Sequence, residues 1–241
     1  MTEHPPTATD VAAETTTIDP AAARQARING AALLLAPLPV VAIMLALVGP
    51  PEWRPILLGA AGWFIALVLR QPVALVSLKL FGQEKTGTIV GWFSGPAEEL
   101  VRLALVLLVL DSVGDALWAG FGWATIEVVL VAINVFAIAA LLTKDDPKSA
   151  EARELLASQG MTTPHHPATG LIERLSATAL HLGFTLLLFA NPWFVLLTLP
   201  LHSLTNMVAV RFVRNHVVAV EVGLAITGAA ALAGGLLATI A

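Results

Sequence analysis

The sequence predicts an all-α fold, a polytopic transmembrane helical bundle of about seven spans, within a range of about six to eight. Composition is the first reason, because 57% of the 241 residues are hydrophobic, 12% are charged and the mean hydropathy is +0.81. Soluble domains carry about 25% charged residues. The second reason is that the apolar residues form runs of roughly 20, the length that crosses a bilayer. The runs lie at 28–48, 53–70, 88–110, 116–142, 171–189, 193–213 and 217–240.

The segments outside these runs define the domain organisation. Residues 1–26 are rich in Thr, Ala, Pro and Glu and lack a hydrophobic run, which predicts a disordered cytoplasmic tail. Residues 27–241 are predicted to form a single transmembrane domain with one long cytoplasmic loop at 143–170, which contains a polar helical piece. The apolar piece 73–81 is too short to cross a bilayer, so we expect a re-entrant or interfacial helix there.

Basic residues predict the orientation, because Lys and Arg stay on the cytoplasmic side of a membrane. The connections at the opposite side contain only Arg54. We therefore expect an integral protein of a prokaryotic plasma membrane, with its N-terminus in the cytoplasm and its C-terminus outside. The basic residues assigned to the cytoplasmic side are Arg24, Arg27, Arg70, Lys79, Lys85, Lys144, Lys148, Arg153, Arg211 and Arg214.

Composition also excludes several classes of function. The chain has no cysteine, which excludes disulfides, thiolate metal ligands and a cysteine nucleophile. Its net charge is -4 and it has no basic stripe, so nucleic acid is not expected as a partner. The lipid bilayer is the partner that the composition requires, and the residues indicate no oligomeric state.

Charged residues interrupt the third predicted span. Glu98, Glu99 and Arg102 lie inside the apolar run 88–110. A charge at the bilayer centre costs about 3 kcal/mol on insertion scales, so such residues persist mainly where they face water or a protein interior and have a function. Gly95-Pro96 stands just before them and is expected to break or kink the helix, because proline lacks an amide donor.

Four consecutive spans each carry an ionisable residue close to the middle. With a rise of about 1.5 Å per residue, these positions fall within roughly one turn of the midplane. The sequence therefore predicts that they meet around one polar cavity inside the membrane. The four residues are Glu98, Glu127, His181 and His202.

Spacing on these helices predicts two pairs. Glu98 and Arg102 are four residues apart, so we expect the arginine to pair with that carboxylate and to leave Glu99 available for chemistry. His202 and Asn206 are also four residues apart, which places an imidazole and an amide on one helix face.

The order of these residues along the chain resembles a known superfamily. A glutamate doublet followed by arginine (EExxR), a glutamate in the next span and histidines in two later spans, the last as HxxxN, are similar to the glutamic-type intramembrane proteases. That superfamily contains the CAAX prenyl proteases, the bacterial Abi or CPBP proteins, and the PrsW and YhfC branches, which this chain resembles most. The resemblance covers residues 88–210 or so. Two positions differ from the family patterns. The CAAX proteases carry the arginine one residue later, and the YhfC branch has a histidine where this chain has Trp123.

The resemblance implies an intramembrane endopeptidase that hydrolyses a peptide bond of a membrane protein or peptide. Hydrolysis needs a base for water, donors for the oxyanion and a proton for the leaving amine. We expect one glutamate of the doublet, helped by His181, to activate water, and His202 with Asn206 to stabilise the oxyanion. The expected catalytic residues are Glu98, Glu99, His181 and His202, and the expected supporting residues are Arg102, Glu127 and Asn206.

Three alternatives stay open at this stage. No cofactor is expected, but His181, His202 and Glu99 would be the ligands if a divalent metal such as zinc were bound. Midplane acids and histidines also build proton-coupled transporters. A non-catalytic membrane peptide-binding or immunity protein could use the same cavity.

Overall fold

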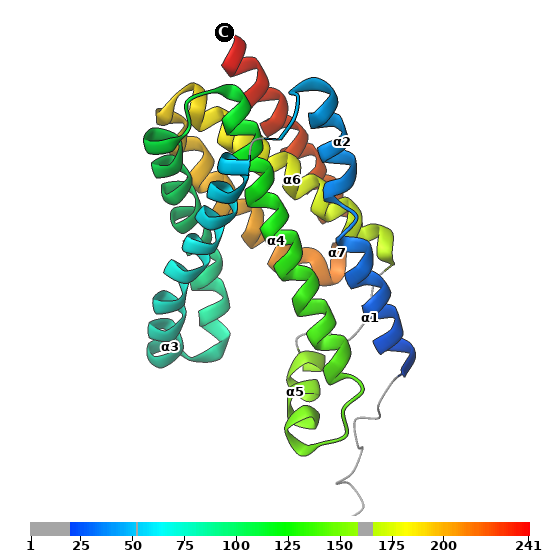
Figure 1. Ribbon diagram of the computed structural model, residues 1–241. Helices are drawn as coiled ribbons and strands as arrows, with labels where there is room; N and C mark the ends of the chain where they lie inside the picture. The colour runs from blue at the N-terminus through cyan, green and yellow to red at the C-terminus, as the bar shows by residue number, and fades with distance from the viewer. Residues whose placement is uncertain (1–19, 52, 159–165) are drawn as a thin grey trace, which may run out of the picture.

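The computed structural model describes residues 20–51, 53–158 and 166–241, and within these residues it contains helices and no strand (Figure 1). The predicted all-α bundle is therefore confirmed. The helices are α1 (Pro20–Leu33), α2 (Pro37–Leu47), α3 (Trp53–Val109), α4 (Val113–Leu141), α5 (Pro147–Ser158), α6 (Pro167–Ala190), the short 3₁₀ helix η1 (Pro192–Phe194) and α7 (Val195–Ile240).

The two longest helices each consist of two arms. In α3 the backbone leaves helical geometry at Gly82, with φ 75° and ψ 177°. This left-handed φ favours glycine, which has no Cβ to clash. In α7 the break is at His216, with φ -139° and ψ 45°. Both breaks turn one long helix into a pair of helices packed within the same bundle (Figure 1).

Within the described residues, six helices are long and apolar enough to cross a membrane, and the chain is therefore an integral membrane protein. The second arm of α3 covers the remaining predicted span, 88–110, and differs from the six because it holds three charges within five residues. The six are Pro20–Leu47, Trp53–Gln83, Val113–Leu141, Pro167–Ala190, Pro192–Val213 and Asn215–Ile240.

Two predicted boundaries are wrong. Residues 73–81 form no separate re-entrant helix, because this piece contains no glycine and the first arm of α3 continues through it to Gly82. The predicted tail is too long, since α1 begins at Pro20 in an alanine-rich segment that buries Ala23 and Ala26. The rest of that tail lies outside the described residues. In the loop 143–170, α5 confirms the polar helical piece.

The expected break at Gly95-Pro96 is also absent, and the structure shows why. Proline removes the amide that would bond to the carbonyl four residues earlier, at Trp92. Ser203 of α7 donates its hydroxyl to that carbonyl at 2.8 Å, so the backbone group is satisfied by a neighbouring helix. Gly95 permits this approach, because a Cβ there would lie 2.2 Å from Ser203 Oγ and 2.3 Å from Leu199 O.

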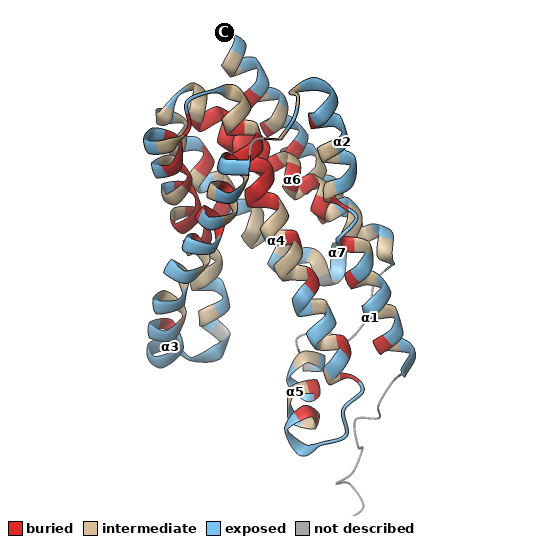
Figure 2. Cartoon of the chain, viewed as in Figure 1, coloured by how far each residue is buried: buried red, intermediate tan, exposed pale blue. Residues whose placement is uncertain are grey.

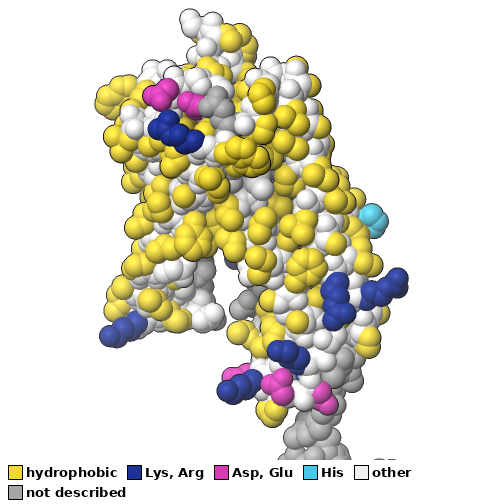
Figure 3. All heavy atoms as spheres, viewed as in Figure 1, with side chains coloured by type: hydrophobic (Ala, Val, Ile, Leu, Met, Phe, Trp, Pro, Cys, Tyr) yellow, Lys and Arg dark blue, Asp and Glu magenta, His cyan; other side chains and the backbone are white. Residues whose placement is uncertain are grey.

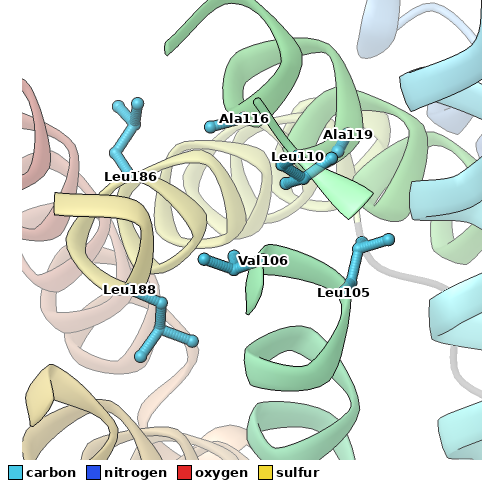
Figure 4. Close-up of a cluster of buried hydrophobic side chains, with 7 residues drawn as sticks. All are labelled: Leu105, Val106, Leu110, Ala116, Ala119, Leu186 and Leu188. Carbon is cyan, nitrogen blue, oxygen red and sulfur yellow. The ribbon is translucent and has the colours of Figure 1, made fainter. Parts of the chain in front are cut away.

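The core gathers around α6, which packs against α4 and α7. Its Phe184 contacts His202 on the first arm of α7, and its Gly183 contacts Ala231 on the second arm. Buried residues concentrate toward the end of the bundle where α3 joins α4 (Figure 2). There Leu105 and Val106 of α3, together with Leu110 just after it, pack with Ala116 and Ala119 of α4 and with Leu186 and Leu188 of α6 (Figure 4). The outer surface shown in Figure 3 is mainly hydrophobic, with charged side chains near its two ends, as lipid contact requires.

Candidate functional site

The glutamate doublet lies on the second arm of α3, on the face turned into the bundle. Glu98 is 3% exposed, and Glu99 and Arg102 are both 0% exposed. The four-residue repeat of the helix would place Arg102 below Glu98, but the arginine turns to Glu99 instead, with Nε 3.2 Å from Oε1. The predicted Glu98–Arg102 pair is therefore wrong.

Glu98 has two other partners. Arg70, on the first arm of α3, places Nη1 3.3 Å from Oε1. The indole of Trp123 on α4 donates to Oε2 at 3.2 Å. The carboxylate thus has a cation on one oxygen and a neutral donor on the other, both held by buried or largely buried side chains.

Glu99 is engaged through one of its two carboxylate oxygens. Its Oε1 accepts hydrogen bonds from Arg102 Nε and from His202 Nδ1, the latter at 2.7 Å. Because the carboxylate accepts, His202 carries a proton on Nδ1. Oε2 of Glu99 is buried and has no hydrogen-bond partner among the described residues. The bond to Glu99 therefore fixes the orientation of the His202 ring.

Arg102 joins α3 to α6. Its guanidinium donates to Thr185 Oγ1 at 2.9 Å, to the His181 carbonyl at 3.3 Å and to His181 Nδ1 at 3.0 Å. It also lies over the ring of Trp123, 4.1 Å from the centroid, a cation–π contact. Since arginine only donates, Nδ1 of His181 must be unprotonated, which assigns the ring proton to Nε2.

His181 and Glu127 form a second polar group beside the doublet. The Nε2 proton of His181 is donated to Glu127 Oε2 at 2.7 Å. Arg174 donates to Glu127 Oε1 at 2.7 Å and also pairs with Glu173. Both nitrogens of His181 are occupied, so its geometry suits a positioning role better than the predicted help in activating water.

A polar cavity of about 130 Å³ lies at the centre of these residues. Its walls come from α3, α4, α6 and α7, as the shared depth of the ionisable residues predicts. Glu98 faces this cavity, whereas Glu99 and Arg102 lie behind its wall. Of the predicted site residues, the cavity is lined by Glu98, Glu127, His181, His202 and Asn206.

Across the cavity His202 faces Glu98. Its Nε2 lies 3.6 Å from Glu98 Oε2, beyond ordinary hydrogen-bond length. The rings of His202 and His181 are 5.7 Å apart between centroids. Asn206, one turn further along α7, donates to Ser94 Oγ at 2.8 Å and keeps its second amide proton.

Two parts of this site were not predicted. Arg70 was assigned to the cytoplasmic edge of a span, and only the hairpin at Gly82 brings it back to Glu98. Trp123 stands where the resembled pattern has a histidine, and its N–H serves a carboxylate as an imidazole N–H can. The signal in the sequence was its spacing, since Trp123 precedes Glu127 by one helical turn.

The donor set also bears on metal binding. One ligand atom each of Glu98, Glu127 and His181 lie within 4.8 Å of one another, which could hold a divalent cation. This trio differs from the predicted one, because Glu99 and His202 bind each other. Arg70 and Arg174 already pair with the two carboxylates, so a cation would have to compete with both arginines.

Comparisons with protein-family profiles, with curated proteins and with solved structures found no match for this chain.

Proposed function

We propose that this protein is a glutamic-type intramembrane endopeptidase that hydrolyses a peptide bond of a membrane protein or peptide. The observation that carries the proposal is the pair formed by Glu98 and His202. A buried carboxylate and a buried imidazole face each other across a cavity between membrane-spanning helices, 3.6 Å apart. The cavity of about 130 Å³ beside them has room for a water molecule that contacts both groups.

In this proposal Glu98 is the general base. It removes a proton from the water, whose oxygen bonds to the carbonyl carbon of the substrate. Glu98 then returns that proton to the amine nitrogen as the C–N bond breaks, so no cofactor is consumed. Glu98 is chosen over Glu99 because it lines the cavity, whereas Glu99 is 0% exposed and bonded to His202.

His202 and Asn206 are the donors proposed for the oxyanion. The ion pairs of the site leave one negative charge without a positive partner. They contain four carboxylates, of Glu98, Glu99, Glu127 and Glu173, and three guanidiniums, of Arg70, Arg102 and Arg174. A proton on His202 Nε2 brings this cluster to neutrality, which lowers the cost of holding it in the membrane. The resulting N–H points across the cavity toward developing negative charge.

The resemblance of the ordered EExxR, Glu, His and HxxxN motifs to glutamic-type intramembrane proteases supports the same proposal. It also supports a prokaryotic plasma membrane as the location. The basic connections support a cytoplasmic N-terminus.

The test compares newly formed peptide termini in membranes from cells that produce the chain. We expect Glu98→Gln to remove these termini, with a loss of about 10² to 10⁴ in rate, because glutamine cannot accept the proton from water. Glu99→Gln should lower the rate less, since it removes only the group that orients His202. Glu221→Gln on α7 is the matched control, a carboxylate outside the cavity wall, and should leave the termini unchanged.

The outcome separates the competing functions. Cleavage that persists in Glu98→Gln contradicts the proposed mechanism, and loss of that cleavage on chelation would assign it to a metal. Absence of any cleavage in the wild-type chain, together with proton-coupled uptake into vesicles, would indicate a transporter instead. A partner that copurifies uncut would indicate a peptide-binding protein.

A further inference from the structure

A second cavity lies between the two arms of α7. It has a volume of about 370 Å³, within the range of about 300–1,000 Å³ typical of ligand pockets. Its walls are almost entirely apolar. The first arm of α7 contributes Leu204, Val208 and Phe212 to these walls, and the second arm contributes Val220, Gly223 and Leu224.

This groove adjoins the polar cavity that Glu98 lines. Thr205, Ala209 and Leu224 line both spaces. Thr205 is three residues after His202, so the groove begins at the level of the proposed oxyanion donors. From there it follows α7 toward the break at His216, which also lines it.

The groove is open at the surface. Leu204, Val208 and Phe212 are 50%, 41% and 47% exposed, so an apolar group outside the protein can reach them. A Cβ placed on Gly223 would meet nothing within 4 Å. A side chain from outside can therefore occupy this space without displacing a residue of the protein.

We propose that this groove binds an apolar stretch of a membrane-embedded peptide and delivers the adjoining peptide bond to Glu98. The inference rests on the proposed function and assigns its substrate a hydrophobic segment beside the cleaved bond. Burial of aliphatic side chains in the groove would hold that segment in place while the backbone enters the polar cavity.

Two hydroxyl groups favour a peptide over a lipid tail. Thr205 donates to the Leu201 carbonyl and Thr227 donates to the Gly223 carbonyl, each at 2.8 Å. With their protons used, both oxygens keep lone pairs that can accept hydrogen bonds. A peptide supplies amide N–H groups to such acceptors, whereas an acyl chain supplies none.

The test uses purified full-length protein in phosphatidylcholine vesicles. The probe is a synthetic transmembrane peptide of about 20 leucine and alanine residues with lysine ends, carrying one diazirine-modified leucine at its centre. A phosphatidylcholine with a diazirine on its acyl chain is the second probe. After illumination, mass spectrometry maps the labelled residues. We expect the peptide probe to label the groove, at residues of both arms of α7.

Gly223→Leu should fill the groove and lower peptide labelling by about tenfold, the effect of a misfit of one or two methylene groups in an apolar pocket. Gly234→Leu is the matched control on the same arm, because a Cβ at Gly234 also meets nothing within 4 Å and this residue does not line the groove. It should leave labelling unchanged.

Equal peptide labelling in Gly223→Leu and Gly234→Leu, or groove labelling by the lipid probe alone, would overturn the inference. If one variant folds poorly, the residues that the two probes label in the wild-type protein still decide between a peptide and a lipid. Glu98→Gln should label like the wild-type protein, because it alters the proposed chemistry and not the groove. Groove labelling with cleavage intact in Glu98→Gln would therefore refute the proposed mechanism while the binding surface stands.

Discussion

At the scale of single residues, the site is defined by which positively charged side chain pairs with each buried carboxylate. Each carboxylate named in the site has at least one arginine partner, and those arginines come from different helices or arms. Removing one partner from a buried pair costs about 3–5 kcal/mol, whereas the intact pair adds little stability by itself. The network is therefore better explained by positioning than by stability.

Trp123 offers the clearest test at this scale. Trp123→Phe keeps an aromatic face for Arg102 but removes the N–H that donates to Glu98. A hydrogen bond to a charged group is worth about 1.5–3 kcal/mol, so we expect cleavage to fall by roughly tenfold to a hundredfold. The measurement is the rate at which the membrane termini lost in Glu98→Gln appear.

Trp123→Leu provides the comparison, since it removes both the donor and the ring. It should lower thermal stability further, by an amount approaching the ~3–5 kcal/mol lost when a buried Trp is truncated. Wild-type cleavage in Trp123→Phe would show that the indole N–H does not support Glu98.

At the scale of elements, close contact between α3 and α7 sets the distance between Glu98 and His202. The contact depends on Gly95, where a Cβ would meet backbone and a hydroxyl of α7 at 2.2–2.3 Å. It depends equally on Ser203, which satisfies the carbonyl that Pro96 leaves without an amide. Gly95-Pro96 thus works as a docking surface between helices and not as a break.

We expect Gly95→Ala to force α3 and α7 apart and to destabilise the protein by about 1–3 kcal/mol, the usual cost of overpacking. Thermal unfolding in detergent would measure this. Gly91→Ala, one turn earlier, is the matched control, because its Cβ would meet only the flexible end of Met207, at Sδ. Equal stability of the two variants would mean that the helices can separate without cost.

At the scale of the whole molecule, the hairpin at Gly82 decides whether the charged arm of α3 crosses the membrane. The first arm, Trp53–Gln83, is a candidate span, so the second arm must return the chain to the level of α4. Figure 1 shows both arms of α3 side by side along the bundle. The charged arm therefore spans the same layer as its apolar partner.

Labelling of single cysteines tests this topology, and the cysteine-free parent provides a blank background. With an impermeant maleimide on intact cells, we expect Asp111→Cys and Trp193→Cys to react. Lys79→Cys and Lys148→Cys should react only after the membrane is permeabilised, because basic connections stay in the cytoplasm. Reaction of Lys79→Cys and Asp111→Cys from one side would mean that the charged arm does not cross.

The sequence by itself determined the fold class, because long apolar runs can be satisfied in lipid only as helices. It also predicted that Glu98, Glu127, His181 and His202 meet at one cavity, since charge at bilayer depth is too costly to be placed without a partner. The tertiary structure alone decided the pairing. Glu99 and not Glu98 binds Arg102, while Arg70 and Trp123 reach Glu98 from elsewhere in the chain. Helical spacing shows which side chains share a face, but packing between helices selects among the partners within reach.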